Sequence, residues 1–214
     1  MGSKSDRDLL DSCKADSSEG RNPDYIKTLS GKNRIIFLLE GAEKKIMKRI
    51  VLMGFMGVGK TTVGKRLARE LELKFIDTDE RIESEQGRKI SDIFAEDGET
   101  AFRDMETDLL KRLQSSNESY VLSIGGGMPV REENRVLLRD IGTVVYLNAS
   151  KEEIIRRVSG DTNRPLLQGG TLEEKVTSLM KAREHIYVET AHKVLHTDGK
   201  TVSDVMEMIE TACF

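Results

Sequence analysis

Residues 48–62 read KRIVLMGFMGVGKTT, and the class of the fold follows from this stretch. An apolar run up to Met53 is short enough for a buried strand, and a helical pattern begins at Thr62. Between them, Gly54-x-x-x-x-Gly59-Lys60-Thr61 matches the phosphate-binding loop (P-loop) in the strand-before, helix-after setting that the motif requires. The alternative is a glycine-rich turn without a ligand. Because the whole pattern fits in context, we predict that the chain binds a nucleoside triphosphate.

The residue types in this loop suit a polyphosphate for physical reasons. Glycines let consecutive backbone N–H groups turn toward the ligand, and the following helix directs the positive end of its dipole at it. Lys60 is expected to reach the β- and γ-phosphates, and the Thr61 hydroxyl is expected to bind Mg²⁺. The predicted nucleotide-binding residues of the loop are Gly57, Val58, Gly59, Lys60, Thr61 and Thr62.

Length and composition limit the class of protein. The 214 residues suit one ordinary α/β domain plus a tail, or two very small domains. The net charge of −3 creates no basic field, so nucleic acid is not an expected partner. No apolar run approaches the roughly 20 residues that span a bilayer, and the N-terminus lacks the apolar core of a signal peptide. We therefore expect a cytoplasmic protein with no membrane partner, and we further expect a monomer.

Cysteine and histidine give no sign of a zinc site or a disulfide framework. Cys13 and Cys213 lie near opposite ends of the chain, without the spacing of metal ligands. His185, His192 and His196 share no such spacing with acidic residues, so we interpret them as structural or surface residues.

Residues 1–46 are predicted to form an N-terminal extension to the main domain, residues 47–214. The segment 1–22 has too little apolar content to offset its ordering entropy, so we expect disorder there. Residues 34–41 have strand composition, and the surrounding segment 31–41 resembles the C-terminal tail of 3-dehydroquinate synthases. The alternative is an extension without chemistry.

Residues 73–79 are predicted to form a short strand that carries two carboxylates at its C-terminal end. In a parallel sheet, ligands bind at the carboxyl ends of the strands. If the strand persists that far, Asp77 and Asp79 lie on one face of it. One of them is then expected to help hold hydrated Mg²⁺, while the other meets an acceptor hydroxyl. The alternative is that these aspartates cap a helix that starts at Glu80.

Further along the chain, apolar runs alternate with helical patterns. This alternation predicts a parallel sheet with right-handed crossovers, in a three-layer α/β/α sandwich. After the run at 120–124, Gly125-Gly126-Gly127 permits close approach of the backbone to a ligand, or forms a loose turn. The glycine-bounded loop 160–170, with Arg164 before a proline, is typical of a mobile lid that brings a cation to a phosphate. The alternative for Arg164 is a solvated loop residue.

An ordered series of motifs over residues 48–209 resembles the shikimate kinases. That family has a P-loop fold of the nucleoside-monophosphate-kinase type with a mobile lid. The matching segments are Asp77-Thr78-Asp79, Ile90-Ser91-Asp92-Ile93-Phe94, Gly98-Glu99-x-x-Phe102-Arg103-x-x-Glu106, Ser123-Ile124-Gly125-Gly126-Gly127, Val144-Val145-Tyr146-Leu147, Arg164-Pro165-Leu166-Leu167 and Ala182-Arg183-Glu184-x-x-Tyr187.

The resemblance implies transfer of the γ-phosphate of ATP to the 3-hydroxyl of shikimate, with Mg²⁺ as the cofactor. Asp79 would orient and deprotonate the hydroxyl, and Asp77 would hold Mg²⁺ through water. Arg103 would bind the shikimate carboxylate, with Glu106 as its partner, although alone it suggests a surface arginine paired with Asp104 or Glu106. The resemblance also assigns Gly125, Gly126, Gly127 and Arg183 to shikimate, Arg157 to the adenine ring, and Arg164 to the transferring phosphate beside Lys60.

Some alternatives stay open at this point. A basic cluster that the family often has near the adenine is replaced by Asp198-Gly199-Lys200, where Lys200 is a candidate substitute. Another small-molecule kinase, such as a gluconate kinase, would keep the P-loop and change the acceptor pocket. A guanine-nucleotide switch is disfavoured because the chain contains no Asn-Lys-x-Asp or Asp-x-x-Gly motif. A homologue without activity is disfavoured because the residues for catalysis are present.

Overall fold

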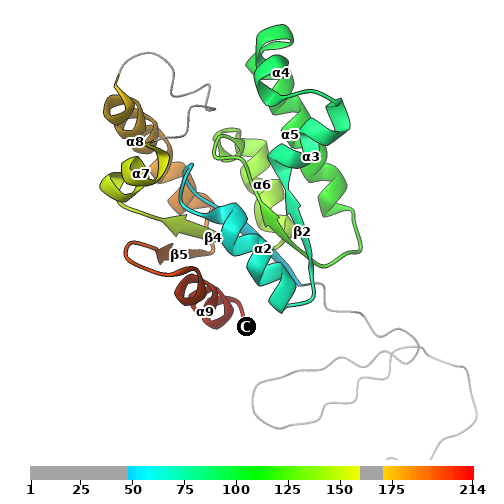
Figure 1. Ribbon diagram of the computed structural model, residues 1–214. Coiled ribbons are helices and arrows are strands. Elements are labelled where there is room, and N and C mark those ends of the chain that lie inside the picture. Colours follow the sequence, from blue (N-terminus) through cyan, green and yellow to red (C-terminus); the bar gives the residue numbers. More distant parts are fainter. Residues whose placement is uncertain (1–47, 160–170) are drawn as a thin grey trace, which may run out of the picture. The chain divides into compact units, whose positions relative to one another are not determined.

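The computed structural model describes residues 48–159 and 171–214 (Figure 1). The predicted extension, residues 1–46, lies outside the described residues, and so does the loop 160–170 that carries Arg164. The expectations for these two segments, the lid among them, therefore stay predictions.

The described part of the chain contains one sheet with the strand order β2-β3-β1-β4-β5. Each pair of neighbouring strands runs parallel. Every residue of β1 and β3 is buried, as their continuous apolar sequences require in a sheet that is covered on both faces. The strands are β1 (Arg49–Met53), β2 (Lys74–Asp77), β3 (Tyr120–Ser123), β4 (Thr143–Asn148) and β5 (Lys193–His196).

Helices cover both faces of this sheet (Figure 1). On one face α2 contacts α9, and on the other α6 contacts both α5 and α8. The architecture is therefore the predicted three-layer α/β/α sandwich. The helices are α2 (Lys60–Glu70), α3 (Thr78–Gln86), α4 (Ile90–Glu96), α5 (Gly98–Gln114), the 3-10 turn η1 (Met128–Val130), α6 (Glu132–Ile141), α7 (Lys151–Val158), α8 (Leu172–Thr190) and α9 (Val202–Cys213).

The P-loop joins the central strand β1 to α2. Its first glycine, Gly54, passes so close to β4 that a Cβ atom there would lie 2.4 Å from the carbonyl oxygen of Leu147. Val63, Leu67 and Ala68 bury the inner face of α2 and hold the start of the helix at the carboxyl edge of the sheet. This edge is where parallel sheets bind ligands.

One local prediction is wrong. β2 ends at Asp77 and α3 begins at Thr78, so Asp77 and Asp79 do not share a face of one strand. The Asp77 side chain accepts hydrogen bonds from the backbone N–H groups of Asp79, at 3.1 Å, and of Glu80. The cap thus turns the chain into a helix two residues earlier than expected.

Two other helices begin at capping residues. Ser150 caps α7 and accepts a hydrogen bond from the N–H of Glu153, and Thr201 forms a capping box with Asp204 at the start of α9. His192 is structural, because its Nδ1 atom accepts a hydrogen bond from the N–H of Val144. Among residues 48–159 and 171–214, no helix has both the length and the apolar character that crossing a membrane requires.

Candidate functional site

The P-loop has the backbone shape of an anion-binding loop. Gly57 and Gly59 adopt φ values of 75° and 100°, in the left-handed region that glycine enters without strain. α2 begins at Lys60, so the first N–H groups of the helix face the loop. The Lys60 ammonium donates to the carbonyl oxygens of Gly54 at 2.9 Å and Phe55 at 3.1 Å, and it therefore lies across the loop.

A cavity of about 320 Å³ opens beside the P-loop, between the loop, α7 and the start of α9. Arg157 of α7 lines it, and its guanidinium is held by the carbonyl of Val58 at 3.0 Å and the carboxylate of Glu153 at 2.6 Å. Lys200, in the connection between β5 and α9, lines the same cavity. The structure therefore brings both predicted adenine-side cations to one cavity next to the phosphate loop.

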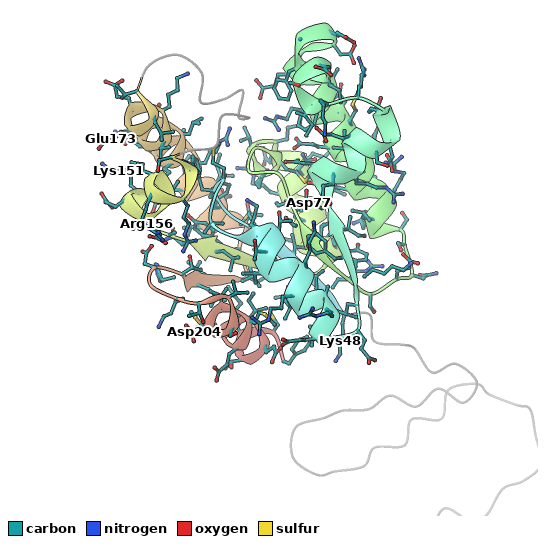
Figure 2. All side chains as sticks on the ribbon, viewed as in Figure 1. Lys48, Asp77, Lys151, Arg156, Glu173 and Asp204 are labelled. Carbon is teal, nitrogen blue, oxygen red and sulfur yellow. The ribbon has the colours of Figure 1, made fainter. Side chains whose placement is uncertain are left out.

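Asp77 lies where β2 meets α3 (Figure 2) and performs two tasks at once. Its Oδ1 atom caps α3, while its Oδ2 atom accepts hydrogen bonds from the hydroxyls of Thr61 at 2.9 Å and Ser123 at 3.0 Å. The sequence presented capping and metal binding as alternatives, but the two carboxylate oxygens allow both. Ser123 was not predicted as a site residue, because only the β2–β3 register, which pairs it with Asp77, brings it here.

Asp79 lies in the first turn of α3 and is half-buried. Burial raises the pKa of its carboxyl to about 6, and the charge of Asp77 adds to this rise, while Lys60 and Arg103 oppose it. A Cβ atom on Gly125 would lie 2.7 Å from Asp79 Oδ1. The carboxylate therefore contacts the first glycine of the triplet, and only glycine fits there.

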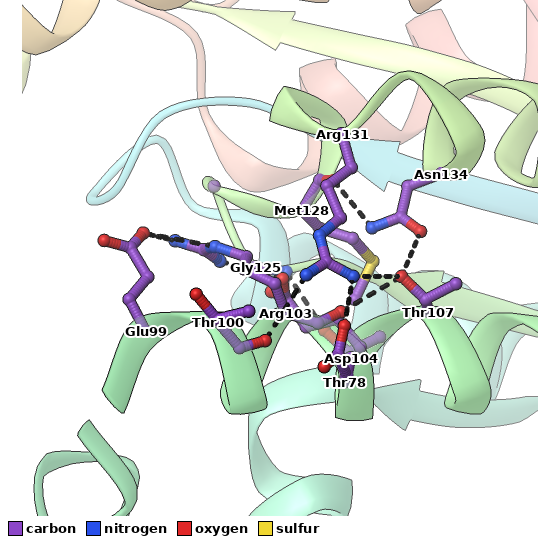
Figure 3. Close-up of polar contacts among 12 residues, drawn as sticks. Thr78, Glu99, Thr100, Arg103, Asp104, Thr107, Gly125, Met128, Arg131 and Asn134 are labelled. Carbon is purple, nitrogen blue, oxygen red and sulfur yellow. Dashed lines mark hydrogen bonds and ion pairs between the residues drawn. The ribbon is translucent and has the colours of Figure 1, made fainter. Parts of the chain in front are cut away.

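Arg103 is a buried residue of α5, with 8% of its surface exposed, and it is not the surface arginine that its helix suggested. It forms ion pairs with Glu106 and Glu99, each at 2.8 Å, while Asp104 pairs with Arg131 instead (Figure 3). The predicted Glu106 contact is present, and the Asp104 alternative is wrong.

Glu106 is 1% exposed, and within the described residues its Oε1 atom has no hydrogen-bond partner. Burial raises the pKa of its carboxyl to about 7, although Arg103 opposes the rise. This carboxyl lies near the same point as Asp79, because a Cβ atom on Gly125 would be 3.2 Å from Glu106 Oε1.

The glycine triplet is where the two predicted carboxylate-binding arginines meet. A Cβ atom on Gly127 would lie 2.5 Å from Arg103 Nη2, and one on Gly126 would lie 3.8 Å from Arg183 Nη1. Arg183, on α8, is 8% exposed. α5 and α8, which are far apart in the sequence, thus bring two guanidinium groups to adjacent glycines, and a side chain at Gly127 would displace the guanidinium of Arg103.

The backbone of the triplet also offers hydrogen-bond donors. The N–H of Gly125 donates to the Thr78 hydroxyl at 3.0 Å, and the N–H of Met128 donates to the carbonyl of Gly125. In the part of the chain that the structure describes, no hydrogen bond is made by the N–H groups of Gly126 and Gly127. Two backbone donors and two guanidinium groups are a suitable set for a carboxylate.

Two further residues, Asn134 and Thr107, hold the segment that follows the glycine triplet, and neither was predicted from the sequence. The Asn134 amide donates to the carbonyl of Met128 at 3.0 Å and accepts from the Thr107 hydroxyl at 2.8 Å, which links α6 to α5 (Figure 3). Both side chains are buried. No local pattern reveals them, because each makes its contact with a different segment.

Comparison with known proteins identifies the family. The model of the shikimate kinase family matches residues 56–213. The chain is 48% identical to a shikimate kinase of Pelotomaculum thermopropionicum, over 76% of this chain and 94% of that protein.

The chain belongs to the shikimate kinase family.

A second relative, a shikimate kinase of Bacillus anthracis, is 43% identical over 77% of this chain and 97% of its own. Among solved structures, a shikimate kinase from Acinetobacter baumannii in complex with shikimate is similar, with a TM-score of 0.74 and 40% identity. That alignment covers 78% of this chain and 93% of the other. Family membership confirms that the P-loop belongs to a kinase, and it confirms the nucleoside-monophosphate-kinase type of fold.

Proposed function

We propose that this protein transfers the γ-phosphate of ATP to the 3-hydroxyl of shikimate, giving shikimate 3-phosphate. The observation that carries the proposal is the meeting of the buried Arg103 and Arg183 at the glycine triplet, beside the carboxylate of Asp79. Shikimate is a small ring with one carboxylate and three hydroxyls. A site with two guanidinium groups for the carboxylate and a separate base for a hydroxyl matches it.

In this mechanism Asp79 receives the proton of the attacking hydroxyl. Its pKa of about 6 lies near enough to neutrality for the carboxyl to be ionised at pH 7 and still accept a proton as the oxygen attacks. Arg103 and Arg183 hold the ring by its carboxylate, so that the hydroxyl is presented to Asp79 and to the phosphate. Gly125 lets the carboxylate of Asp79 approach the ring.

The donor side works by position and charge, without a covalent enzyme intermediate. The N–H groups of the P-loop and the start of α2 bind the phosphates of ATP, and Arg157 stacks on the adenine in the cavity beside them. Lys60 exchanges its bonds to the loop carbonyls for the β- and γ-phosphates, and it offsets charge as the phosphoryl group moves. Arg164 is proposed to add a second cation, on the strength of the sequence alone.

The residues near Asp77 fit a hydrated Mg²⁺ ion. The described residues contain no group of three or more acidic, histidine or cysteine side chains that would form an all-protein metal site. Mg²⁺ in kinases needs fewer protein ligands, because waters and phosphates supply the others. The Thr61 hydroxyl and the Asp77 carboxylate, 2.9 Å apart, would hold it. When bound, the ion neutralises charge on the β- and γ-phosphates.

A gluconate kinase would use the same donor side with a different acceptor pocket. Gluconate is an open-chain acid whose carboxylate two arginines would also bind, so the choice of shikimate over gluconate is supported by the family match and not by the arginines alone. The location in the cytoplasm and the monomeric state are parts of the proposal that come from the sequence.

A coupled assay of ADP release tests the function directly. With ATP and Mg²⁺, turnover is expected with shikimate but not with gluconate or without an acceptor, and phosphorus NMR of the product should identify the 3-phosphate. Turnover with gluconate in place of shikimate would overturn the acceptor assignment. Equal ADP release without an acceptor would overturn the assignment as a kinase of small molecules.

A further inference from the structure

The hydroxyl of Tyr187 donates a hydrogen bond to the carbonyl oxygen of Gly126 at 2.5 Å. Tyr187 is 1% exposed and lies on α8, one helical turn after Arg183, so the two side chains are on the same face of the helix. A Cβ atom on Gly126 would be 3.4 Å from the Tyr187 oxygen and 3.8 Å from Arg183 Nη1. The hydroxyl and the guanidinium therefore meet the same glycine.

Core packing accounts for the ring of Tyr187 but not for its hydroxyl. The ring packs against that of Tyr146, with centroids 5.2 Å apart and an interplanar angle of 55°. A phenylalanine would make the same contact. Burial raises the pKa of the Tyr187 hydroxyl, while Arg183 and Arg103 oppose the rise. The hydroxyl therefore stays protonated near neutrality and remains a donor to Gly126.

The hydrogen bond to the Gly126 carbonyl fixes the orientation of a whole peptide unit, because that unit is planar. The carbonyl of Gly126 and the N–H of Gly127 belong to one peptide unit and point in opposite directions across it. When the carbonyl is held toward α8, the Gly127 N–H is turned away from α8. This N–H is one of the two donors in the triplet that make no hydrogen bond within the described residues.

We propose that Tyr187 is a positioning residue for the acceptor: its hydroxyl orients the Gly126–Gly127 peptide so that the Gly127 N–H faces the substrate carboxylate. A glycine peptide without this bond has unusual freedom to rotate. The hydroxyl also lies near Arg183, which is proposed to bind the same carboxylate. The inference rests on the proposed function, because it assumes a carboxylate ligand at the triplet.

The test is Tyr187→Phe, which keeps the ring and removes only the hydroxyl. Loss of a buried hydrogen bond that aligns a binding group is expected to raise the shikimate KM about five- to tenfold, with kcat and the ATP KM changed less than about twofold. Calorimetry without nucleotide should show a similar loss of shikimate affinity.

Tyr146→Phe is the matched control, because Tyr146 is the other member of the aromatic pair and its hydroxyl bonds to Asn148 on the same strand. It is expected to leave the shikimate KM unchanged.

The outcomes separate this inference from the proposed function. If the wild-type protein does not phosphorylate shikimate, the function itself fails. If the wild type is active and Tyr187→Phe has a normal shikimate KM, the positioning role is wrong. A lower melting temperature, together with a lower kcat and equal increases in the KM values for shikimate and ATP, would show a purely structural role. That outcome would also overturn the inference.

Discussion

Asp79 illustrates how neighbours adjust a single carboxyl group. Burial and Asp77 raise its pKa, and the cations Lys60 and Arg103 limit the rise, so the value of about 6 is a balance. In the proposed mechanism Lys60 binds the phosphates of ATP and Arg103 binds the acceptor. The donor side and the acceptor side would therefore both affect the base.

Asp79→Asn is expected to lower kcat by about a hundredfold or more, because an amide cannot accept the proton of the acceptor hydroxyl. ATP affinity, measured by calorimetry, should stay near that of the wild type. Glu80→Gln is the control, since Glu80 is the next residue of α3 but pairs with Lys65 at an exposed position. A near-normal rate for Asp79→Asn would remove Asp79 from the role of base.

Arg103 shows what local sequence cannot reveal about one residue. An arginine among acidic residues on a helix suggests a solvated ion pair. The structure instead buries it between α5 and the glycine triplet, because Gly127 leaves room for the guanidinium. Its proposed role comes only from the family resemblance.

Among the elements, α5 buries two charged side chains, Arg103 and Glu106, on its inner face. Arg103 and Glu106 are three residues apart and pair at 2.8 Å, while Glu99 lies one turn earlier and is exposed at 60% of its side chain. Glu106 faces the charges of Arg103, Asp79 and Arg131, yet burial dominates and raises its pKa to about 7. A helix that places a carboxyl there loses stability when that carboxyl ionises.

The stability of the protein should therefore depend on pH through Glu106. Its pKa is higher in the folded state than the ordinary value of 4.5, so its stabilising contribution is present at low pH and is lost as the pH rises toward 7. Glu106→Gln cannot titrate. Relative to the wild type, its free energy of unfolding should rise by on the order of 3 kcal/mol between about pH 4 and pH 8.

Urea unfolding at several pH values measures this difference. Glu99→Gln is the matched control, because it removes a carboxylate from the same arginine at an exposed position. Its stability relative to the wild type is expected to change little over the range. A Glu106→Gln difference that stays constant with pH would contradict the raised pKa.

The boundary between β2 and α3 was predicted wrongly, because the strand ends at Asp77 and does not extend to Asp79. The run Asp77-Thr78-Asp79 is compatible with a strand end and with a helix cap. Asp77 is both, because its two oxygens face different partners. The cap competes locally with the extended conformation and ends the strand, a choice that depends on hydroxyls from Thr61 and Ser123 on other elements.

For the whole molecule, the described residues 48–159 and 171–214 contain the sheet, its helices and most of the segment 56–213 that the family model matches. The sheet begins its contacts at Lys48, whose N–H donates to the Ser119 hydroxyl and whose carbonyl accepts from the N–H of Tyr120. A cut before this residue spares these bonds.

Deletion of residues 1–45 is accordingly expected to leave kcat, both KM values and the melting temperature close to those of the full chain. Enzyme assays and calorimetric melting on the two proteins measure this. An inactive or unfolded truncated protein would show that the extension belongs to the functional domain.

Local patterns were enough to predict the P-loop and the parallel α/β/α architecture, because each depends on residues that are neighbours along the chain. The family resemblance added the acceptor and the roles of the arginines. Strand register and helix packing were needed to bring Ser123 to Asp77, Asn134 to Thr107 and Tyr187 to Gly126. These contacts join segments far apart in the sequence, where no periodicity or spacing carries information about distance in space.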